Sequence, residues 1–184
     1  FPTFEYVFAS GPVDQNIAVE LQQMWLKNLG IHMELRQLEW KVYLNAQSEL
    51  DYDVSRSSWI GDYDDANTFL GMFTSDNGNN RTGWKDKHYD QLIQEANQQV
   101  DLTKREKLFQ QAETILVCDD APIAPLYFYM GVNYFDANRI QGLYENILDQ
   151  HPLQYIRKTG RESKIESRIQ KMDSARQQLA ATLR

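Results

Sequence analysis

The chain of 184 residues carries 26 acidic and 19 basic side chains, which gives a formal charge of −7. This length supports about one domain with a substantial hydrophobic core. The acidic balance argues against nucleic acid as a partner, because a negative surface is repelled by a phosphate backbone. The sequence contains no run of about 18 apolar residues, the length that a membrane-spanning helix needs. The single cysteine, Cys118, excludes an internal disulfide and argues against a metal cluster.

The first elements alternate between strand and helix. Residues 4–9 are predicted to form a strand, and since residues 1–9 lack the basic flank of a signal peptide, the chain is expected to begin inside a domain. Helical spacing then predicts a helix over 14–29, closed by Gly30 in the left-handed conformation. Its apolar face comprises Ala18, Leu21, Trp25 and Leu29. Residues 31–36 alternate as a second strand, so a parallel βαβ unit is expected.

The alternation continues along the chain. A short helix over 41–49 and a strand over 52–58 indicate an α/β architecture. The polar residues 75–80 predict a loop, and a further helix is expected over 86–99. The apolar face of that helix comprises Tyr89, Leu92, Ile93 and Ala96.

Two features are expected in the last third of the α/β region. Thr103 and Glu106 have the spacing of a capping box, which predicts the start of a helix over 104–117. The apolar run at 121–135 contains two prolines near its start and many aromatic residues. It is therefore expected to be extended and to lie near the sheet or at its edge.

No catalytic or metal-binding motif is found. The chain has no nucleophile elbow, P-loop or glycine-rich dinucleotide turn. The acids near residues 62–65 do not follow the spacing of an EF-hand calcium loop. The three histidines are far apart and lack metal-ligand spacing to a cysteine or carboxylate: His32, His88 and His151. The chain is therefore expected to be no enzyme and to bind no cofactor or metal.

One constellation indicates a ligand site. Arg56, Trp59 and Asp62 follow one another at intervals of three at the end of the strand predicted over 52–58. Ligands of open α/β sheets bind beyond the carboxyl ends of the strands. On spacing alone, a salt-bridged loop explains the same residues equally well.

The string YDVSRSSWIGDY at 52–63 resembles the corresponding segment of the extracytoplasmic solute-binding proteins (family 5) that deliver oligopeptides and dipeptides to ABC transporters. Four further stretches are similar to that family in the same order: AVELQQMWLKNLGIHMELRQLEWKVYL, HYDQLIQEA, TKREKLFQQAETIL and DDAPIAPLYFY. The resemblance covers residues 1–158 and corresponds to the carboxyl-terminal part of a longer family chain. It implies one lobe of a two-lobed periplasmic-binding-protein-like fold, with a mixed sheet flanked by helices.

The resemblance also implies roles for individual residues. In the oligopeptide binders the aspartate at the place of Asp62 pairs with the amino terminus of the ligand, through a charge-assisted hydrogen bond. Backbone groups on either side of Trp59, in Ser58 and Ile60, are expected to pair with an extended peptide. Arg56 corresponds to an arginine that meets the ligand carboxylate in some relatives.

One departure from the family pattern concerns the ligand. Oligopeptide binders carry an Arg-His pair in the loop before this strand, where this chain has Gln47 and Ser48. The contacts of that pair are absent, so ligand length and side-chain preference stay open. A sugar or metal chelate also stays open as the ligand, because the wider family carries both.

The resemblance implies the substrate-binding component of an ABC importer, which encloses a peptide between two lobes and delivers it to a membrane permease. The expected partners are the peptide, the permease and an amino-terminal lobe of the same protein. The expected location is periplasmic or extracytoplasmic, with a membrane anchor in a preceding segment as one option. Two alternatives stay open: a hydrolase that uses Asp62 and Asp65 as an acid pair, and a helix-mediated interaction module.

The tail at 159–184 lies outside the resemblance and has a different composition, with six basic and three acidic side chains. A domain boundary is therefore predicted at 158. The tail is expected to be an extra carboxyl-terminal helix that forms when its apolar stripe docks on the lobe or on another copy, which would allow self-association. The stripe comprises Ile165, Ile169, Met172, Arg176, Leu179 and Leu183.

Overall fold

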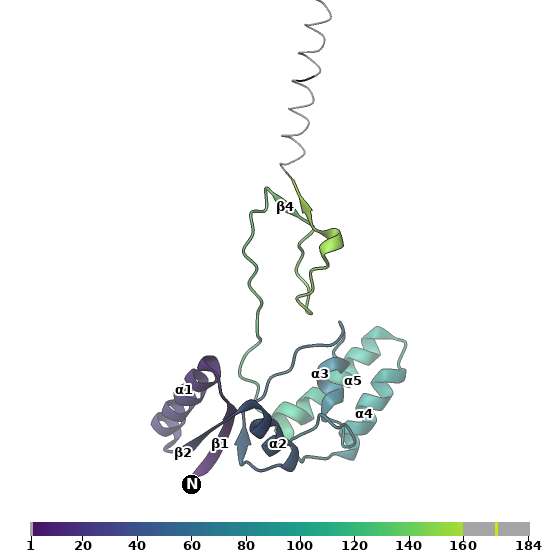
Figure 1. The fold of residues 1–184 in the computed structure, drawn as a ribbon. Helices are drawn as coiled ribbons and strands as arrows, with labels where there is room; N and C mark the ends of the chain where they lie inside the picture. Colours follow the sequence, from purple (N-terminus) through teal and green to yellow (C-terminus); the bar gives the residue numbers. More distant parts are fainter. Residues whose placement is uncertain (1, 160–171, 173–184) are drawn as a thin grey trace, which may run out of the picture. The chain divides into compact units, whose positions relative to one another are not determined.

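The computed structural model describes residues 2–159 and Met172 (Figure 1). The chain divides into two compact units, Phe1–Leu126 and Tyr127–Arg184, and each is described by itself. This division lies before the boundary predicted at 158. The tail beyond that boundary, with the stripe predicted on it, lies outside the described residues except for Met172. The domain boundary at 158 therefore stays a prediction.

The first unit begins with the predicted βαβ element. Strand β1 (Phe4–Ala9) and strand β2 (Met33–Leu38) pair in parallel along their whole length, and helix α1 (Pro12–Leu29) connects them. Gly30 caps α1 with φ 68°, the left-handed conformation that glycine adopts without steric penalty. The predicted parallel βαβ unit is confirmed.

Strand β1 is the centre of the sheet, and alternate residues along it face opposite layers. Tyr6 and Phe8 pack with Ala18 of α1 on one side. Val7 and Ala9 pack with Tyr43 on the other side, where helix α2 (Trp40–Glu49) covers the sheet. Figure 1 shows α1 and α2 flanking the strands. The α/β class is thus confirmed for the first unit.

The predicted apolar face of α1 is correct except at its end, because Leu29 is 64% exposed. The helix has 18 residues and the strands have six. A helix of that length extends about 27 Å and such a strand about 20 Å, so the last turn of α1 projects past the sheet.

The third strand is shorter than predicted: β3 comprises only Val54–Ser55, paired in parallel with β1, and the sheet order is β2-β1-β3. Before the start of β3, the Asp53 carboxylate accepts a hydrogen bond from Glu5 N at 2.8 Å in place of a ladder bond. After the end of β3, Arg56 N donates to Val7 O at 2.9 Å, and β1 itself ends at Ala9. The ladder therefore has no room to continue to residue 58.

The second half of the first unit is helical. It contains α3 (Asn67–Leu70), the 3₁₀ turn η1 (Gly71–Phe73), α4 (Lys87–Gln98), α5 (Leu102–Thr114) and the π-helical turn η2 (Ile115–Asp119). The predicted face of α4 is confirmed, because all four of its apolar residues are buried against α5. The cluster comprises Tyr89, Leu92, Ile93, Ala96, Phe109, Ala112 and Leu116.

The predicted capping box is wrong. Asp101 caps α5 instead, and its carboxylate accepts from Thr103 N at 3.0 Å and from Lys104 N at 3.2 Å. An aspartate two residues earlier satisfies the free amides of the first turn. Thr103 therefore lies inside the helix.

The apolar run at 121–135 forms no strand ladder with any described residue. Its predicted place near the sheet therefore stays a prediction. Several of its large side chains are exposed, including Phe128 at 97% and Tyr134 at 95%.

The second unit contains a small antiparallel ladder of β4 (Ile140–Gln141) and β5 (Arg157–Lys158), with the 3₁₀ turn η3 (Leu153–Tyr155) before β5. The mixed sheet of the prediction is therefore divided: the three-stranded sheet is parallel, and the antiparallel pairing belongs to a separate sheet. In the described part of the chain, no helix is long and apolar enough to cross a lipid bilayer.

Replacing Tyr89 by phenylalanine should destabilise the first unit by about 1–3 kcal/mol, the cost of leaving a buried polar group without its partner. The Tyr89 side chain is fully buried and its hydroxyl donates to Leu70 O at 2.6 Å, which ties α4 to α3. Urea denaturation measures the change. Tyr134→Phe is the matched control, since Tyr134 is 95% exposed. Equal stability of both variants and the parent would contradict this role of Tyr89.

Candidate functional site

Residues 57–60 leave the sheet at the end of β3 and are exposed. Trp59 is 37% exposed and Ile60 is 72% exposed, and Ser58 is exposed beside them. Among the described residues, no backbone hydrogen bond involves residues 58–60. Their amides and carbonyls can therefore pair with an added extended chain.

The far end of this segment is anchored on α3. Asp62 N donates to the hydroxyl of buried Thr68 at 2.9 Å. Gly61 is buried, and a Cβ added there would lie 3.2 Å from both Phe69 and Thr68, so this close approach favours glycine. These contacts use the backbone of Asp62 and leave its carboxylate at the surface.

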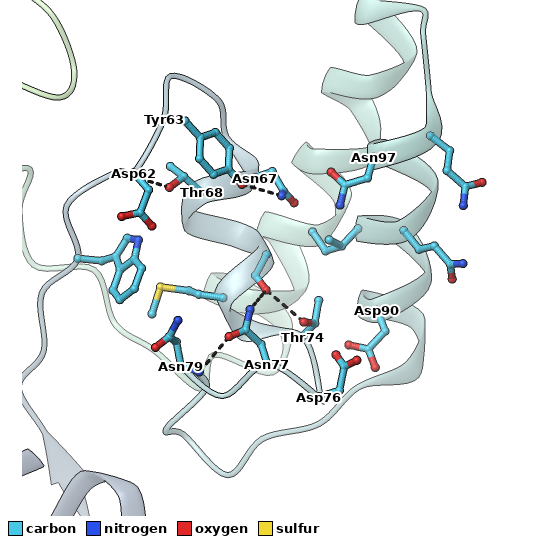
Figure 2. A pocket seen from close by; sticks show the side chains of 16 residues that line it. Asp62, Tyr63, Asn67, Thr68, Thr74, Asp76, Asn77, Asn79, Asp90 and Asn97 are labelled. Carbon is cyan, nitrogen blue, oxygen red and sulfur yellow. Dashed lines mark hydrogen bonds between the residues drawn. The ribbon is translucent and has the colours of Figure 1, made fainter. Parts of the chain in front are cut away.

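Trp59 and Asp62 line one pocket of about 810 Å³. Figure 2 shows Asp62 on the side of the α3 helix and Asn97 of α4 across the pocket. The remaining wall comes from α3, η1 and the loop 76–79. A volume of this size is within the range of small-molecule sites. The structure thus brings two of the five predicted site residues into one cavity and exposes Ser58 and Ile60 next to it.

Arg56 is placed differently from the prediction. Its Nε lies 2.9 Å from Asp14 Oδ1, and the two side chains are only 15% and 22% exposed. Tyr43 OH donates a hydrogen bond to the carbonyl of Arg56. Arg56 does not line the pocket. The expected alternative of a salt-bridged loop therefore applies to Arg56, with Asp14 in the first turn of α1 as the partner.

The loop after Asp62 is fixed to α5 by a bidentate ion pair. Arg105 Nη1 and Nη2 donate to the two carboxylate oxygens of Asp65 at 2.6 and 2.8 Å. Arg105 Nε also donates to Ala96 O, and its guanidinium lies 4.6 Å from the ring centre of Phe109. The hydrogen bonds from Arg105 lower the pKa of Asp65. A carboxyl group held in this way is a poor general acid, which does not favour the acid pair of Asp62 and Asp65.

Gln47 and Ser48 lie within helix α2, in agreement with the helix predicted over 41–49. Gln47 is buried, and its amide joins two segments: Nε2 donates to Ser55 Oγ at 3.0 Å, and Oε1 accepts from Arg81 Nη1 at 3.2 Å. Gln47 therefore ties α2 to β3 and to the segment that contains Arg81.

Sequence reasoning missed most of the pocket wall. Polar residues of α4 beside its buried stripe supply Asp90, Gln94, Asn97 and Gln98, and the loop 76–79 supplies a further carboxylate and two amides. The available signal was the density of Asn, Asp and Gln over residues 76–98. Such residues are ordinary on a solvated helix face, and only the fold shows that they surround a cavity.

Comparison with known proteins gives a consistent result. Residues 1–81 match the family described as bacterial extracellular solute-binding proteins, family 5 Middle. The chain is 37% identical to the oligopeptide-binding protein OppA of Bacillus subtilis over 138 residues, which are 74% of this chain and 25% of that protein. It is also 37% identical to the dipeptide-binding protein DppE of the same organism over 155 residues, 84% of this chain and 27% of that protein.

Solved structures with a similar fold come from the same family of proteins. The chain superposes on the unliganded open form of the periplasmic murein tripeptide-binding protein MppA with a TM-score of 0.71 and 27% identity, covering 85% of this chain and 30% of that one. Such neighbours have the two-lobed periplasmic-binding-protein-like fold, and the chain has the fold of part of one lobe. The chain spans about a quarter of the length of the two curated relatives.

Replacing Asp65 by asparagine should lower the free energy of unfolding at pH 7 by about 1–2 kcal/mol, because it removes a charge-assisted pair and leaves Arg105 half-buried. The folded-state pKa of Asp65 is lowered. Its stabilisation is therefore present above the unfolded pKa of about 3.9 and is lost as the pH falls through the folded value. The difference between parent and variant, measured by urea denaturation, should shrink as the pH falls below about 4.

Asp64→Asn is the control for this measurement. Asp64 is exposed on the same loop and makes no hydrogen bond or ion pair with another described residue. A difference for Asp65→Asn that persists unchanged in acid would show that the ion pair with Arg105 is not its source.

Proposed function

Because the chain belongs to the family 5 bacterial extracellular solute-binding proteins, we propose that it forms one wall of a peptide-binding cleft in the substrate-binding component of an ABC importer. The observation that carries this proposal is the segment 58–62, which has unpaired backbone groups among the described residues and presents Trp59 and Asp62 to one pocket. The named activities of OppA and DppE, which bind oligopeptides and dipeptides, support the ligand class.

Ligand capture uses three kinds of contact in this proposal. Ser58 and Ile60 add the peptide backbone to the chain by hydrogen bonds that do not depend on side-chain identity. The Asp62 carboxylate receives the ammonium group at the amino terminus of the peptide. Trp59 packs against the ligand and shields this ion pair from water, which strengthens it. No catalytic step is involved.

The remaining parts of the function concern partners and place. An amino-terminal lobe closes over the bound peptide, and the closed protein delivers it to the membrane permease. The protein acts outside the cytoplasm, as the periplasmic relatives do by name, with membrane anchoring through a segment that precedes residue 1. Self-association through the tail at 159–184 stays a separate prediction.

Replacing Asp62 by asparagine should weaken peptide binding by about 1.5–3 kcal/mol, the range for a hydrogen bond to a charged group. Calorimetry with a tripeptide, on a full-length protein that contains this chain, measures the loss. Acetylating the amino terminus of the peptide should cost a similar amount in the parent and little more in the variant. Asp64→Asn, on the same loop but outside the pocket lining, is the matched control. Additive losses from Asp62→Asn and acetylation would exclude a contact between Asp62 and the amine.

Arg56 acts in this proposal by holding the end of β3 against α1, since its guanidinium is already paired with Asp14. Arg56→Gln and Asp14→Asn should then weaken binding of a free-acid tripeptide and of its carboxyl-terminal amide by the same factor. The same calorimetry measures both peptides with each variant. A loss confined to the free acid in Arg56→Gln would instead establish the contact with the ligand carboxylate that the family resemblance implies.

A further inference from the structure

The pocket beside Asp62 is strongly biased in charge. Three of its lining residues are carboxylates, Asp62, Asp76 and Asp90, and none of the 16 lining residues is Lys, Arg or His. The last turn of α4, which also lines the pocket, contains no basic residue. The carbonyl end of a helix adds negative potential there. The cavity therefore favours a positively charged group.

The pocket also offers hydrogen-bond acceptors that are not bonded to another described residue. Among the described residues, no hydrogen bond or ion pair ends on the carboxylate of Asp62 or Asp76, and the buried Oδ1 of Asn67 accepts none. Asp90 Oδ1 accepts from Ser75 N at 2.9 Å, which leaves the second oxygen of that carboxylate. The exposed carboxylates are open to solvent, and a guanidinium or ammonium group that displaces this water supplies several donors together with the charge.

The acceptors are grouped at two separate places. The bond from Ser75 N holds the Asp90 carboxylate beside the turn that carries Asp76, and Figure 2 shows these two carboxylates next to each other. Asp62 lies apart from them, near the α3 end of the cavity. Asp62 is assigned above to the amino terminus of the peptide. The second group is then a separate place for a cation within the same pocket.

We propose that Asp76 and Asp90 form a subsite for a cationic side chain, the guanidinium of arginine or the ammonium of lysine, near the amino terminus of the bound peptide. This rests on the proposed function, because it takes Asp62 as the place of the peptide amine. Six amide side chains also line the pocket and offer neutral acceptors: Asn67, Asn77, Asn79, Gln94, Asn97 and Gln98.

The test is a titration of the ¹⁵N-labelled 184-residue chain with Nα-acetyl-arginine amide, followed by NMR at millimolar ligand. This compound has no free amine or carboxylate, so it reports on the side-chain subsite alone. Saturable shifts are expected at the side-chain amides of Asn97 and Gln94. Nα-acetyl-citrulline amide has nearly the same shape without the charge. It should bind about threefold more weakly or worse, as expected for charges that are partly exposed.

Asp76→Asn should weaken binding of the arginine compound by a similar factor, and Asp64→Asn should leave it unchanged. Asp76 is exposed, so the variant is expected to fold, and its backbone spectrum shows whether it does. Equal binding of the citrulline and arginine compounds, equal binding to Asp76→Asn and the parent, or no shift at the pocket amides would each overturn the subsite. Equal affinity for 1,4-diaminobutane would overturn its assignment to a peptide side chain.

A second titration separates this inference from the proposed function. Trialanine has an ammonium terminus and no cationic side chain, and it should shift the Trp59 and Asp62 resonances in the parent and in Asp76→Asn alike. If trialanine binds in this way while the arginine compound does not, the subsite fails and the proposed function stands. If neither compound shifts the pocket residues, the subsite and the proposed function fail together.

Discussion

The length of strand β1 is the constraint on which the site depends. This central strand pairs with both neighbours and ends at Ala9, because the chain turns there into α1. In the register with β3, Val7 lies opposite Ser55, so Ala9 at the end of β1 lies opposite residue 57, and β1 offers no partner to residue 58. The chain must therefore leave the sheet by residue 58, and among the described residues no backbone hydrogen bond involves residues 58–60. A segment with unpaired donors and acceptors at a sheet end is well suited to receive an extended ligand.

Both ends of this segment are held firmly, which explains how it keeps a defined shape. Before it, the pair of Arg56 with Asp14 joins the end of β3 to α1. After it, the Asp62 amide is bonded to Thr68, and Asp65 is held by the bidentate contact with Arg105. Binding to such a segment orders few new groups, so little conformational entropy is lost. Arg56 and Arg105 thus act on the position of the segment, and the Asp62 carboxylate stays exposed, where the proposed function assigns it to the peptide amine.

Much of the fold could be predicted from the sequence, since the elements with strong periodicity were correct. The stripe of α4 and the βαβ unit follow from local spacing of apolar residues, and Gly30 marks the end of α1. The end of β3 was missed because it depends on β1, which is distant in the sequence. The cap of α5 was missed for a local reason, because Asp101 and Thr103 are two neighbouring candidates for the same position.

The site was predictable in part for the same reason. Trp59 and Asp62 lie in one short string, so their resemblance to the family was visible in the sequence. The partner of Arg56 lies more than forty positions away in the chain, at Asp14, and no local pattern indicates that ion pair. The acidic part of the pocket combines Asp76 from a loop with Asp90 from a helix, and only the tertiary structure brings them together. Pairs of polar groups that are far apart in the chain leave no local pattern from which a single sequence could predict them.

Backbone amide hydrogen exchange at Ser58 and Ile60, measured with and without a saturating tripeptide, tests the central claim most directly. If the peptide adds to this segment as a strand, the amides that bond to it should exchange more slowly in the complex, because exchange requires their hydrogen bonds to open. The account predicts this protection within residues 58–62 and little change in α1, which lies on the far side of the sheet from α2. Saturated binding with unchanged exchange at residues 58–62 would contradict it.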